Sequence, residues 1–325
     1  MKTQPKSINA LMKYMREQKN IEISGSVQKR NLRNMGYFHG YKGYRFCKRP
    51  ERKFEYTNFD ELQAIYDFDM DIKATVYSPL MSLETALKNY VLEIFIEQSK
   101  SESFAEIFNN ILDDYKHKKG TKAYSSEIKK RLMVRNKVYN EITKNYGRNF
   151  IVSHYYKKDE VIPIWAIFEL LTLGEFGNLL HCANQKARKE IEKSLGIDIS
   201  KDSDYRFIER CVFLIKDLRN AVAHNNIIFD TRFKGNNKIA KKVMQYLQYE
   251  TSIDYISFNT IVDYVILLSF LMKKCGFNKT TILRFIGDYE ERCEQLRKQI
   301  PITIYSKFIY TDTNVKLEKI KTFVS

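Results

Sequence analysis

Three polar residues in the segment LRNAVAHNN (residues 218–226) are of types that can act together on a phosphate group: Arg219, Asn220 and His224. An arginine stays cationic and offers a planar fork of donors to phosphate oxygens. A histidine titrates near neutral pH, so it can accept or donate a proton. An asparagine can hold the imidazole in one tautomer or bind a further oxygen. Together, these side chains could hold a small anion and move a proton on it.

These groups suit the cleavage of RNA by transesterification. The ribose 2′-hydroxyl attacks its own phosphate, the arginine stabilises the developing charge, and the histidine moves a proton. This chemistry requires no metal, and the chain has no carboxylate cluster or His/Cys spacing that predicts one, so we expect no metal and no cofactor. The alternative is a chance Arg-x-x-x-x-His pattern with a structural or solvated histidine. Spacing alone favours that alternative, whereas Asn220 and the basic segments described below bring the two interpretations level.

One helix must position the three side chains. Residues 202–222 are predicted to be helical, because apolar residues recur there at helical spacing. These are Phe207, Cys211, Leu214, Ile215 and Leu218. At about 100° per residue, Asn220 and His224 lie about 40° apart around the helix, and Arg219 lies about 140° from His224. We therefore expect the three groups to share one side of the helix and to converge on a single anion.

The composition predicts an all-α fold. The chain has 325 residues, of which 44% are hydrophobic, so it can bury a sizeable core. Only 12 Gly and 5 Pro interrupt it, and so few breakers favour long helices over a sandwich or barrel. We expect a helical bundle with a small, basic, helical N-terminal module.

Cysteine usage and apolar segments indicate a cytoplasmic protein. The five cysteines are scattered and odd in number, which is typical of reduced thiols. The N-terminus lacks the apolar core of a signal peptide. The longest apolar run, VILLSFLM (265–272), is too short to span a bilayer. We therefore expect no membrane partner.

Helical periodicity extends along most of the chain. Residues 59–97 are predicted to form one or two long helices, interrupted or kinked around Pro79. Further helical patterns, the first capped by Ser7, cover residues 8–18, 103–115, 124–146, 163–181, 186–194, 202–222, 251–274 and 279–299. Charged loops are expected at 116–122 and 232–242. The β-branched tail after Pro301 could add a short strand or pack along the bundle.

The charge is unevenly placed along the chain. The formal net charge is +16, and residues 1–56 and 115–148 hold far more Lys and Arg than Asp and Glu. Clustered cations release counterions from a phosphate backbone, so two basic blocks suggest a polyanionic partner. The alternative is that the lysines serve solubility. From charge and motif we expect three parts: a basic RNA-binding module at 1–56, a helical domain at 57–300 and a tail packed on the bundle at 301–325.

Aromatic residues are interleaved with cations in the N-terminal block. Such a mixture can stack on unpaired bases and neutralise phosphates, or the rings can simply dock the module on the core. Both interpretations stay open. The predicted RNA-binding residues of the two blocks are Lys29, Arg30, Arg33, Tyr37, Tyr41, Lys42, Tyr44, Arg45, Lys48, Lys118, Lys119, Lys122, Lys129, Lys130 and Arg131.

Four segments, in order, resemble the AbiD/AbiF group of abortive-infection proteins in the HEPN ribonuclease superfamily. LRNAVAHNN resembles the R-N-x-x-x-H signature of HEPN domains, and NLRNMGYFHGYKGYRF is similar to the group's N-terminal segment. IYDFDMDIKATVYSPLMSLETALKNYV looks like its first HEPN helix, with Glu84 and Lys88 where the family has Glu and a basic residue. FIVSHYYKKDEVIPIWAIFELLTLGEFGNLL resembles its His-Tyr, Pro-x-Trp and Leu-x-x-Gly pattern. The resemblance covers roughly residues 7–300.

The resemblance implies a HEPN-type helical bundle, metal-independent endoribonuclease activity and a role in anti-phage defence. It also implies a structured noncoding RNA as a partner, and a homodimer in which Arg219 and His224 of both subunits form one composite site. The chain holds one R-N-x-x-x-H motif, whereas transesterification is best served by both a base and an acid. Glu84 and Lys88 are expected to support the site from the facing helix. Standing alone, a Glu–Lys pair at this spacing is usually a surface stabiliser.

Two other functions remain open from the sequence. One is a HEPN-fold protein that holds a noncoding RNA without cleaving it. The other is a DNA-binding regulator, which only the basic N-terminal helices suggest, since no clear helix-turn-helix signal is present.

Overall fold

The computed structural model of the chain describes residues 7–234 and 240–325. The first six residues of the predicted N-terminal module, and residues 235–239 of the loop predicted at 232–242, lie outside the described residues. In the described ranges the chain is organised as helices α1 to α15 with two short helices of other types, and only isolated bridges have β character. The predicted all-α class is therefore confirmed.

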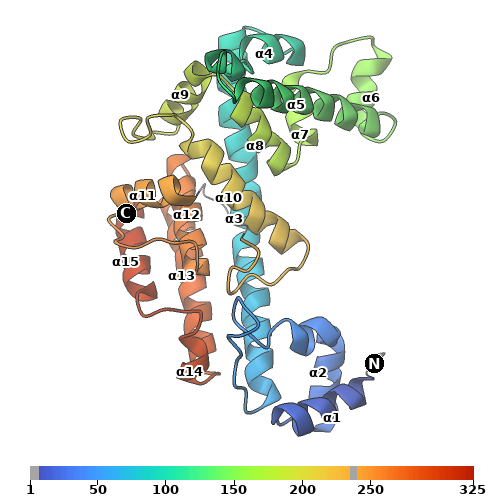
Figure 1. The fold of residues 1–325 in the computed structure, drawn as a ribbon, viewed down its shortest axis with the longest axis vertical. Helices are drawn as coiled ribbons and strands as arrows, with labels where there is room; N and C mark the ends of the chain where they lie inside the picture. Colours follow the sequence, from blue (N-terminus) through green and yellow to red (C-terminus); the bar gives the residue numbers. More distant parts are fainter. Residues whose placement is uncertain (1–6, 235–239) are drawn as a thin grey trace.

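A single long helix, α3 (Phe59–Ser99), forms the axis of the molecule (Figure 1). The side chain of Asn58 accepts a hydrogen bond from the backbone of Glu61 at its start, and Lys100 ends it in a left-handed conformation. Of the one or two helices expected for residues 59–97, the structure has one, and it continues without interruption through Pro79. A proline inside a helix costs about 3 kcal/mol. Packing of α3 against several helices along its length, with Pro79 itself buried, offsets that cost.

The two ends of α3 carry different groups of helices (Figure 1). At one end α1 (Ile8–Lys19) packs on α2 (Gly25–Tyr37), which continues into a π-helix, η1 (Phe38–Lys42), that contacts α3. The other end carries α4 (Phe104–Asn110), η2 (Asp114–Lys118), α5 (Tyr124–Asn145), α6 (Phe150–Lys157), α7 (Ile164–Leu170), α8 (Leu173–Cys182) and α9 (Gln185–Ser194). The N-terminal helices and α4–α9 are thus separated by the length of α3.

The middle of α3 is covered by the remaining helices. These are α10 (Phe207–Ala223), α11 (Ala240–Thr251), α12 (Ile261–Lys274), α13 (Lys279–Arg297), α14 (Ile302–Tyr305) and α15 (Thr313–Val324). α10 packs on α8 and α3, and α13 packs on α3. The strand considered for the tail after Pro301 is wrong, because this segment forms α14 and α15. α15 packs on α12 and α13, where buried Lys316 lies 3.0 Å from the carboxylate of Asp263.

Two predicted helices begin or break at other places than expected. The pattern at 163–181 is divided between α7 and α8, because Thr172 and Glu175 form a capping box that starts a new helix. The pattern at 251–274 becomes helical only at Ile261. Residues 252–260 include Ser252 and Phe258 at positive φ, which no helix accommodates. Apolar residues keep their helical spacing across both breaks, so periodicity alone does not predict either break.

One hydrophobic core joins all these helices, with buried members from Leu11 near the N-terminus to Val324 at the C-terminus. None of the helices described for residues 7–234 and 240–325 has both the length and the apolar character needed to cross a lipid bilayer.

Candidate functional site

The end of α10 places Asn220 and His224 at the surface. His224 caps the helix, and Asn225 follows in the left-handed conformation, with a φ of 51°. The backbone N–H of Asn225 donates to the carbonyl of Val222, and that of Asn226 donates to the carbonyl of Ala221. This is the Schellman arrangement, for which asparagine is among the better residues after glycine. The sequence HNN therefore ends the helix at the histidine and leaves its side chain exposed.

Arg219 is held from the facing helix by Glu84. The guanidinium Nε lies 3.4 Å from Oε2 of Glu84, and the arginine side chain remains about one third exposed, at 32%. Both atoms are buried, and apart from this ion pair neither makes a hydrogen bond within the described part of the chain. Because the carboxylate engages the Nε edge, the two terminal nitrogens of Arg219 remain available for an anion. The predicted support of the motif from α3 thus has a geometric basis at Glu84.

Lys88 binds the other carboxylate oxygen of Glu84 and is itself buried. Its Nζ donates to Oε1 of Glu84 at 3.1 Å and to the carbonyl of Leu171 at 2.8 Å. Leu171 is the residue between α7 and α8, so Lys88 satisfies a carbonyl that the helix break leaves free. Its ammonium is therefore used inside the protein, to orient Glu84 and to fix the start of α8.

Asn220 and His224 present open polar groups at the same end of α10 as this arginine. Both residues are exposed, whereas Arg219 is half-buried. Neither the amide of Asn220 nor the imidazole of His224 makes a hydrogen bond within residues 7–234 and 240–325. A permanently cationic group held by a carboxylate, with an amide and an imidazole on the same helix end, can bind a phosphate and exchange a proton with it.

The loop after His224 is fixed by a buried group that the sequence did not single out. Asp69 on α3 is fully buried, and its Oδ1 accepts from the backbone N–H groups of Ile228 and Phe229 at 2.8 and 2.7 Å. Lys73, one turn further along α3, lies 2.7 Å from the other oxygen of Asp69 and donates to Oδ1 of Asn225 at 2.8 Å. The Asp69–Lys73 pair thus holds the chain on the C-terminal side of His224. The available signal was the spacing of four residues between Asp69 and Lys73, which places them on one face of α3.

The N-terminal module meets the same pair. The hydroxyl of Tyr44 donates to Oδ2 of Asp69 at 2.7 Å, and the ring of Tyr44 stacks on that of Phe229, with ring centroids 5.7 Å apart. Burial, followed by the nearby carboxylate of Asp69, raises the pKa of Tyr44 far above its usual range, so the hydroxyl stays a donor. Tyr41 is buried as well. Of the two interpretations left open for these aromatic residues, the burial of Tyr41 and Tyr44 favours docking of the module on the core.

A second set of contacts also joins the N-terminal module to the segment that follows α10. Arg232 donates to the carbonyls of Gly43 and Phe46 at 2.7 and 2.8 Å, and it pairs with buried Asp230. His39 lies beside the junction with a buried Nδ1 that has no partner among the described residues. Burial and the cation of Lys73 lower the pKa of His39, which favours the neutral imidazole.

The remaining predicted RNA-binding residues of the N-terminal module lie at or near its surface. Arg30, Arg33 and Tyr37 are exposed, and Lys29, Lys42, Arg45 and Lys48 are half-buried. The Nζ of Lys42 lies over the ring of Tyr37, 5.8 Å from its centroid. The Nζ of Lys48 lies 3.5 Å from the hydroxyl of Tyr310 and so contacts the C-terminal tail.

In the second basic block (residues 115–148), the predicted RNA-binding lysines lie at or near the surface, whereas Arg131 makes hydrogen bonds within the protein. Lys119, Lys122, Lys129 and Lys130 are exposed and Lys118 is half-buried. Arg131 donates to the carbonyls of Leu112 and Phe108, each at 2.6 Å, and its guanidinium lies 3.7 Å from the centroid of the Phe108 ring. Arg131 therefore closes the end of α4; it is half-buried, and its predicted contact with RNA stays a prediction.

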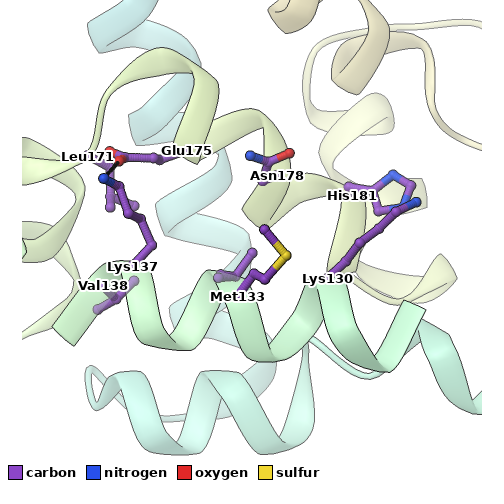
Figure 2. Close-up of a pocket in the computed structure, with 9 residues that line it drawn as sticks. Lys130, Met133, Lys137, Val138, Leu171, Glu175, Asn178 and His181 are labelled. Carbon is purple, nitrogen blue, oxygen red and sulfur yellow. Dashed lines mark hydrogen bonds and ion pairs between the residues drawn. The ribbon is translucent and has the colours of Figure 1, made fainter. Parts of the chain in front are cut away.

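A pocket of about 240 Å³ lies between α5 and α8 (Figure 2), and His224 is not among the residues that line it. Lys130 and His181 lie at one end and Lys137 with Glu175 at the other. The two ring nitrogens of His181 contact Glu127 and Glu209 at 2.9 and 2.8 Å.

The charged groups of this pocket neutralise one another. Burial raises the pKa of Glu127, but hydrogen bonds from Lys130 and His181 outweigh that effect and bring it to about 2. Lys137 lies 3.0 Å from Glu175. Because these charges already have partners, the pocket offers no unpaired cation to a phosphate, and the end of α10 remains the better candidate site.

Comparison with protein families gives a match over more than half of the chain. A family model described as "Abi-like protein" matches residues 30–230, a range that contains α3, α10 and the loop held by Asp69. No curated protein and no solved structure is significantly similar to the chain.

Proposed function

Because the chain belongs to the Abi-like protein family, we propose that it is an endoribonuclease of the HEPN type that acts in abortive infection against phage. One observation carries the proposal: Glu84 on α3 holds Arg219 at the same helix end that exposes Asn220 and His224. A merely solvated histidine needs no arginine fixed by a carboxylate from another helix.

In this proposal each side chain has a separate role. The free edge of Arg219 binds the scissile phosphate and stabilises its transition-state charge. His224 moves a proton, either from the attacking 2′-hydroxyl or to the 5′ leaving oxygen. Asn220 orients the imidazole or a phosphate oxygen. The products are a 2′,3′-cyclic phosphate and a free 5′-hydroxyl, and no step is assigned to a metal ion.

The proposal includes a homodimer. In an in-line displacement the attacking 2′-oxygen and the leaving 5′-oxygen lie on opposite sides of the phosphorus. Two imidazoles related by a two-fold axis can serve one oxygen each, as base and as acid. The exposed position of His224 at a helix end is compatible with such a pairing. We further propose that the surface cations of the two basic blocks hold RNA, including a structured noncoding RNA that restrains or guides the enzyme.

The test is cleavage of a labelled RNA by the purified protein in the presence of EDTA. We expect products with 2′,3′-cyclic phosphate ends, and His224→Ala should lower the rate by about 100-fold or more, the usual loss of a general acid or base. His117→Ala removes another exposed histidine and serves as the matched control.

Each outcome is informative. Cleavage by His224→Ala at the wild-type rate would remove His224 from the mechanism. If the wild-type protein binds RNA tightly but does not cleave it, the non-catalytic RNA-holding function is the better description. Tighter binding of duplex DNA than of RNA at matched salt would favour a DNA-binding regulator.

A further inference from the structure

Exposed aromatic rings gather where α5 ends and α6 begins. Phe150 is 81% exposed, and Tyr146 and Tyr156 are 55% and 48% exposed. Single exposed apolar residues are common on soluble proteins, but several large rings grouped together mark an interaction site. Figure 1 shows α6 at the outer edge of the molecule, at the end of α3 opposite the N-terminal helices.

The corner that carries these rings is well ordered by its own hydrogen bonds. Gly147 turns the chain at a φ of 76°, and its N–H donates to the hydroxyl of Ser153. The side chain of Asn149 caps α6 by accepting from the backbone of the next turn, at Ile151 and Val152. The rings are therefore presented on a fixed support, which lowers the entropy that a ligand must remove on binding.

The rings are arranged in pairs. Phe150 and His154 lie with centroids 5.8 Å apart and planes inclined by 32°, and Tyr146 meets Tyr156 edge to face at 5.6 Å. Since Phe150 is almost fully exposed despite its neighbour, one face of its ring is open to a planar ligand. A nucleobase is such a ligand, and stacking on an aromatic side chain does not depend on which base it is.

The charge of this corner identifies the class of partner. Between residues 142 and 158 the sequence holds Lys144, Arg148, Lys157 and Lys158 and no Asp or Glu. The flanking carboxylates are Glu141, which lies 3.7 Å from Lys144, and the exposed Asp159 and Glu160. Arg148, Lys157 and Lys158 are exposed next to the rings. In a two-fold symmetric dimer built on this face, like charges would meet like charges, so a second copy of the chain is a poor occupant. Open rings with surrounding cations instead fit a strand that offers bases and phosphates together.

We propose that the corner formed by residues 146–158 is a binding site for single-stranded RNA, with an unpaired base stacked on Phe150 and the backbone phosphates beside Arg148. The choice of RNA over other polyanions rests on the function proposed above. The site is separate from Arg219 and His224, and its role is to hold RNA outside the reaction centre.

The experiment measures binding, not cleavage, so it does not depend on the nuclease activity. The full-length His224→Ala protein is titrated into a labelled oligouridylate and, separately, into a labelled RNA duplex, with fluorescence anisotropy as the readout. Adding Phe150→Ala should weaken binding of the single strand about tenfold, and Phe150→Trp should restore it. Arg148→Gln should reduce the slope of log affinity against log salt by about 0.7.

Tyr249→Ala is the matched control, because Tyr249 is also an exposed ring beside a lysine but lies on α11. It should leave binding unchanged. Equal affinity of the Phe150→Ala protein and its parent for the single strand would overturn the proposal, as would an equal loss for strand and duplex. A change in mass by light scattering without a change in RNA affinity would also overturn it, because the rings would then serve self-association.

Discussion

Arg219 and Glu84 are far apart in the sequence, yet Nε and Oε2 lie 3.4 Å apart between α10 and α3. This contact fixes one edge of the guanidinium and leaves the other for a ligand. Arginine suits this position because its planar fork can serve a carboxylate and a phosphate at once, which the compact ammonium of lysine cannot do. At the scale of single residues, the site therefore depends on the shape of the side chain as well as its charge.

Conservative substitutions at this pair should have large effects on cleavage. Arg219→Lys keeps the charge but loses the fork, so we expect the rate to fall about 100-fold. Glu84→Gln keeps the shape but loses the charge that positions the arginine, and we expect a smaller loss of about tenfold. Rates are measured with saturating RNA. Arg297→Lys, in an exposed Arg–Glu pair on α13, should change nothing; full activity of Arg219→Lys would contradict the assigned role.

The loop that follows α10 is the element on which the position of His224 depends. The backbone N–H groups of Ile228 and Phe229 in this loop donate to the carboxylate of Asp69. The side-chain oxygen of Asn225 accepts a hydrogen bond from Lys73. The same carboxylate accepts the hydroxyl of Tyr44 from the N-terminal module. One buried ion pair on α3 thus joins the helix end, its following loop and the module.

Breaking this pair should destabilise the fold much more than removing one neutral hydrogen bond. Asp69→Asn leaves the buried ammonium of Lys73 without its counterion, and we expect a loss of about 3 kcal/mol in the free energy of unfolding. Tyr44→Phe removes one hydrogen bond and should cost about 1 kcal/mol. Denaturation by urea measures both. Asp67→Asn, at an exposed position of the same helix, is the control; equal losses for Asp69→Asn and Asp67→Asn would show that the pair has no such role.

For the molecule as a whole, α3 separates three regions with different proposed tasks. The N-terminal helices lie at one end, the helices with the exposed rings at the other, and α10, which carries Arg219 and ends at His224, lies between them. We propose that RNA held at either end reaches the end of α10, where a homodimer would bring both copies of His224 to the same strand.

A composite site predicts how mixed dimers behave. When the wild-type protein and His224→Ala are unfolded and refolded together, or co-expressed, a dimer with one imidazole lacks either the base or the acid. Only dimers of two wild-type chains then cleave RNA, and their share of all dimers is the square of the wild-type fraction. Total activity should therefore follow this square, and activity per wild-type chain should fall in direct proportion to the wild-type fraction. Two independent sites would give a linear dependence instead, and light scattering of the mixture checks that dimers are present.

Local patterns in the sequence were sufficient for much of the fold. Helical periodicity, few glycines and few prolines predicted the all-α class, and the spacing of Arg219, Asn220 and His224 predicted that they lie on one helix end. Glu84 and Lys88 came only from the family resemblance. These features depend on residues within a few turns of one another, where spacing along the chain fixes spacing in space.

Tertiary structure decided what the side chains do. Tyr41 and Tyr44 sit in a basic segment, yet they are buried, whereas Phe150 is open to solvent. Asp69 binds backbone groups 159 and 160 positions further along the chain, and the capping box at Thr172 breaks a continuous apolar pattern. The sequence by itself determined which residues could form helices and carry phosphate chemistry. Which of them are buried, paired or left open depends on contacts between distant segments, and no local pattern encodes those contacts.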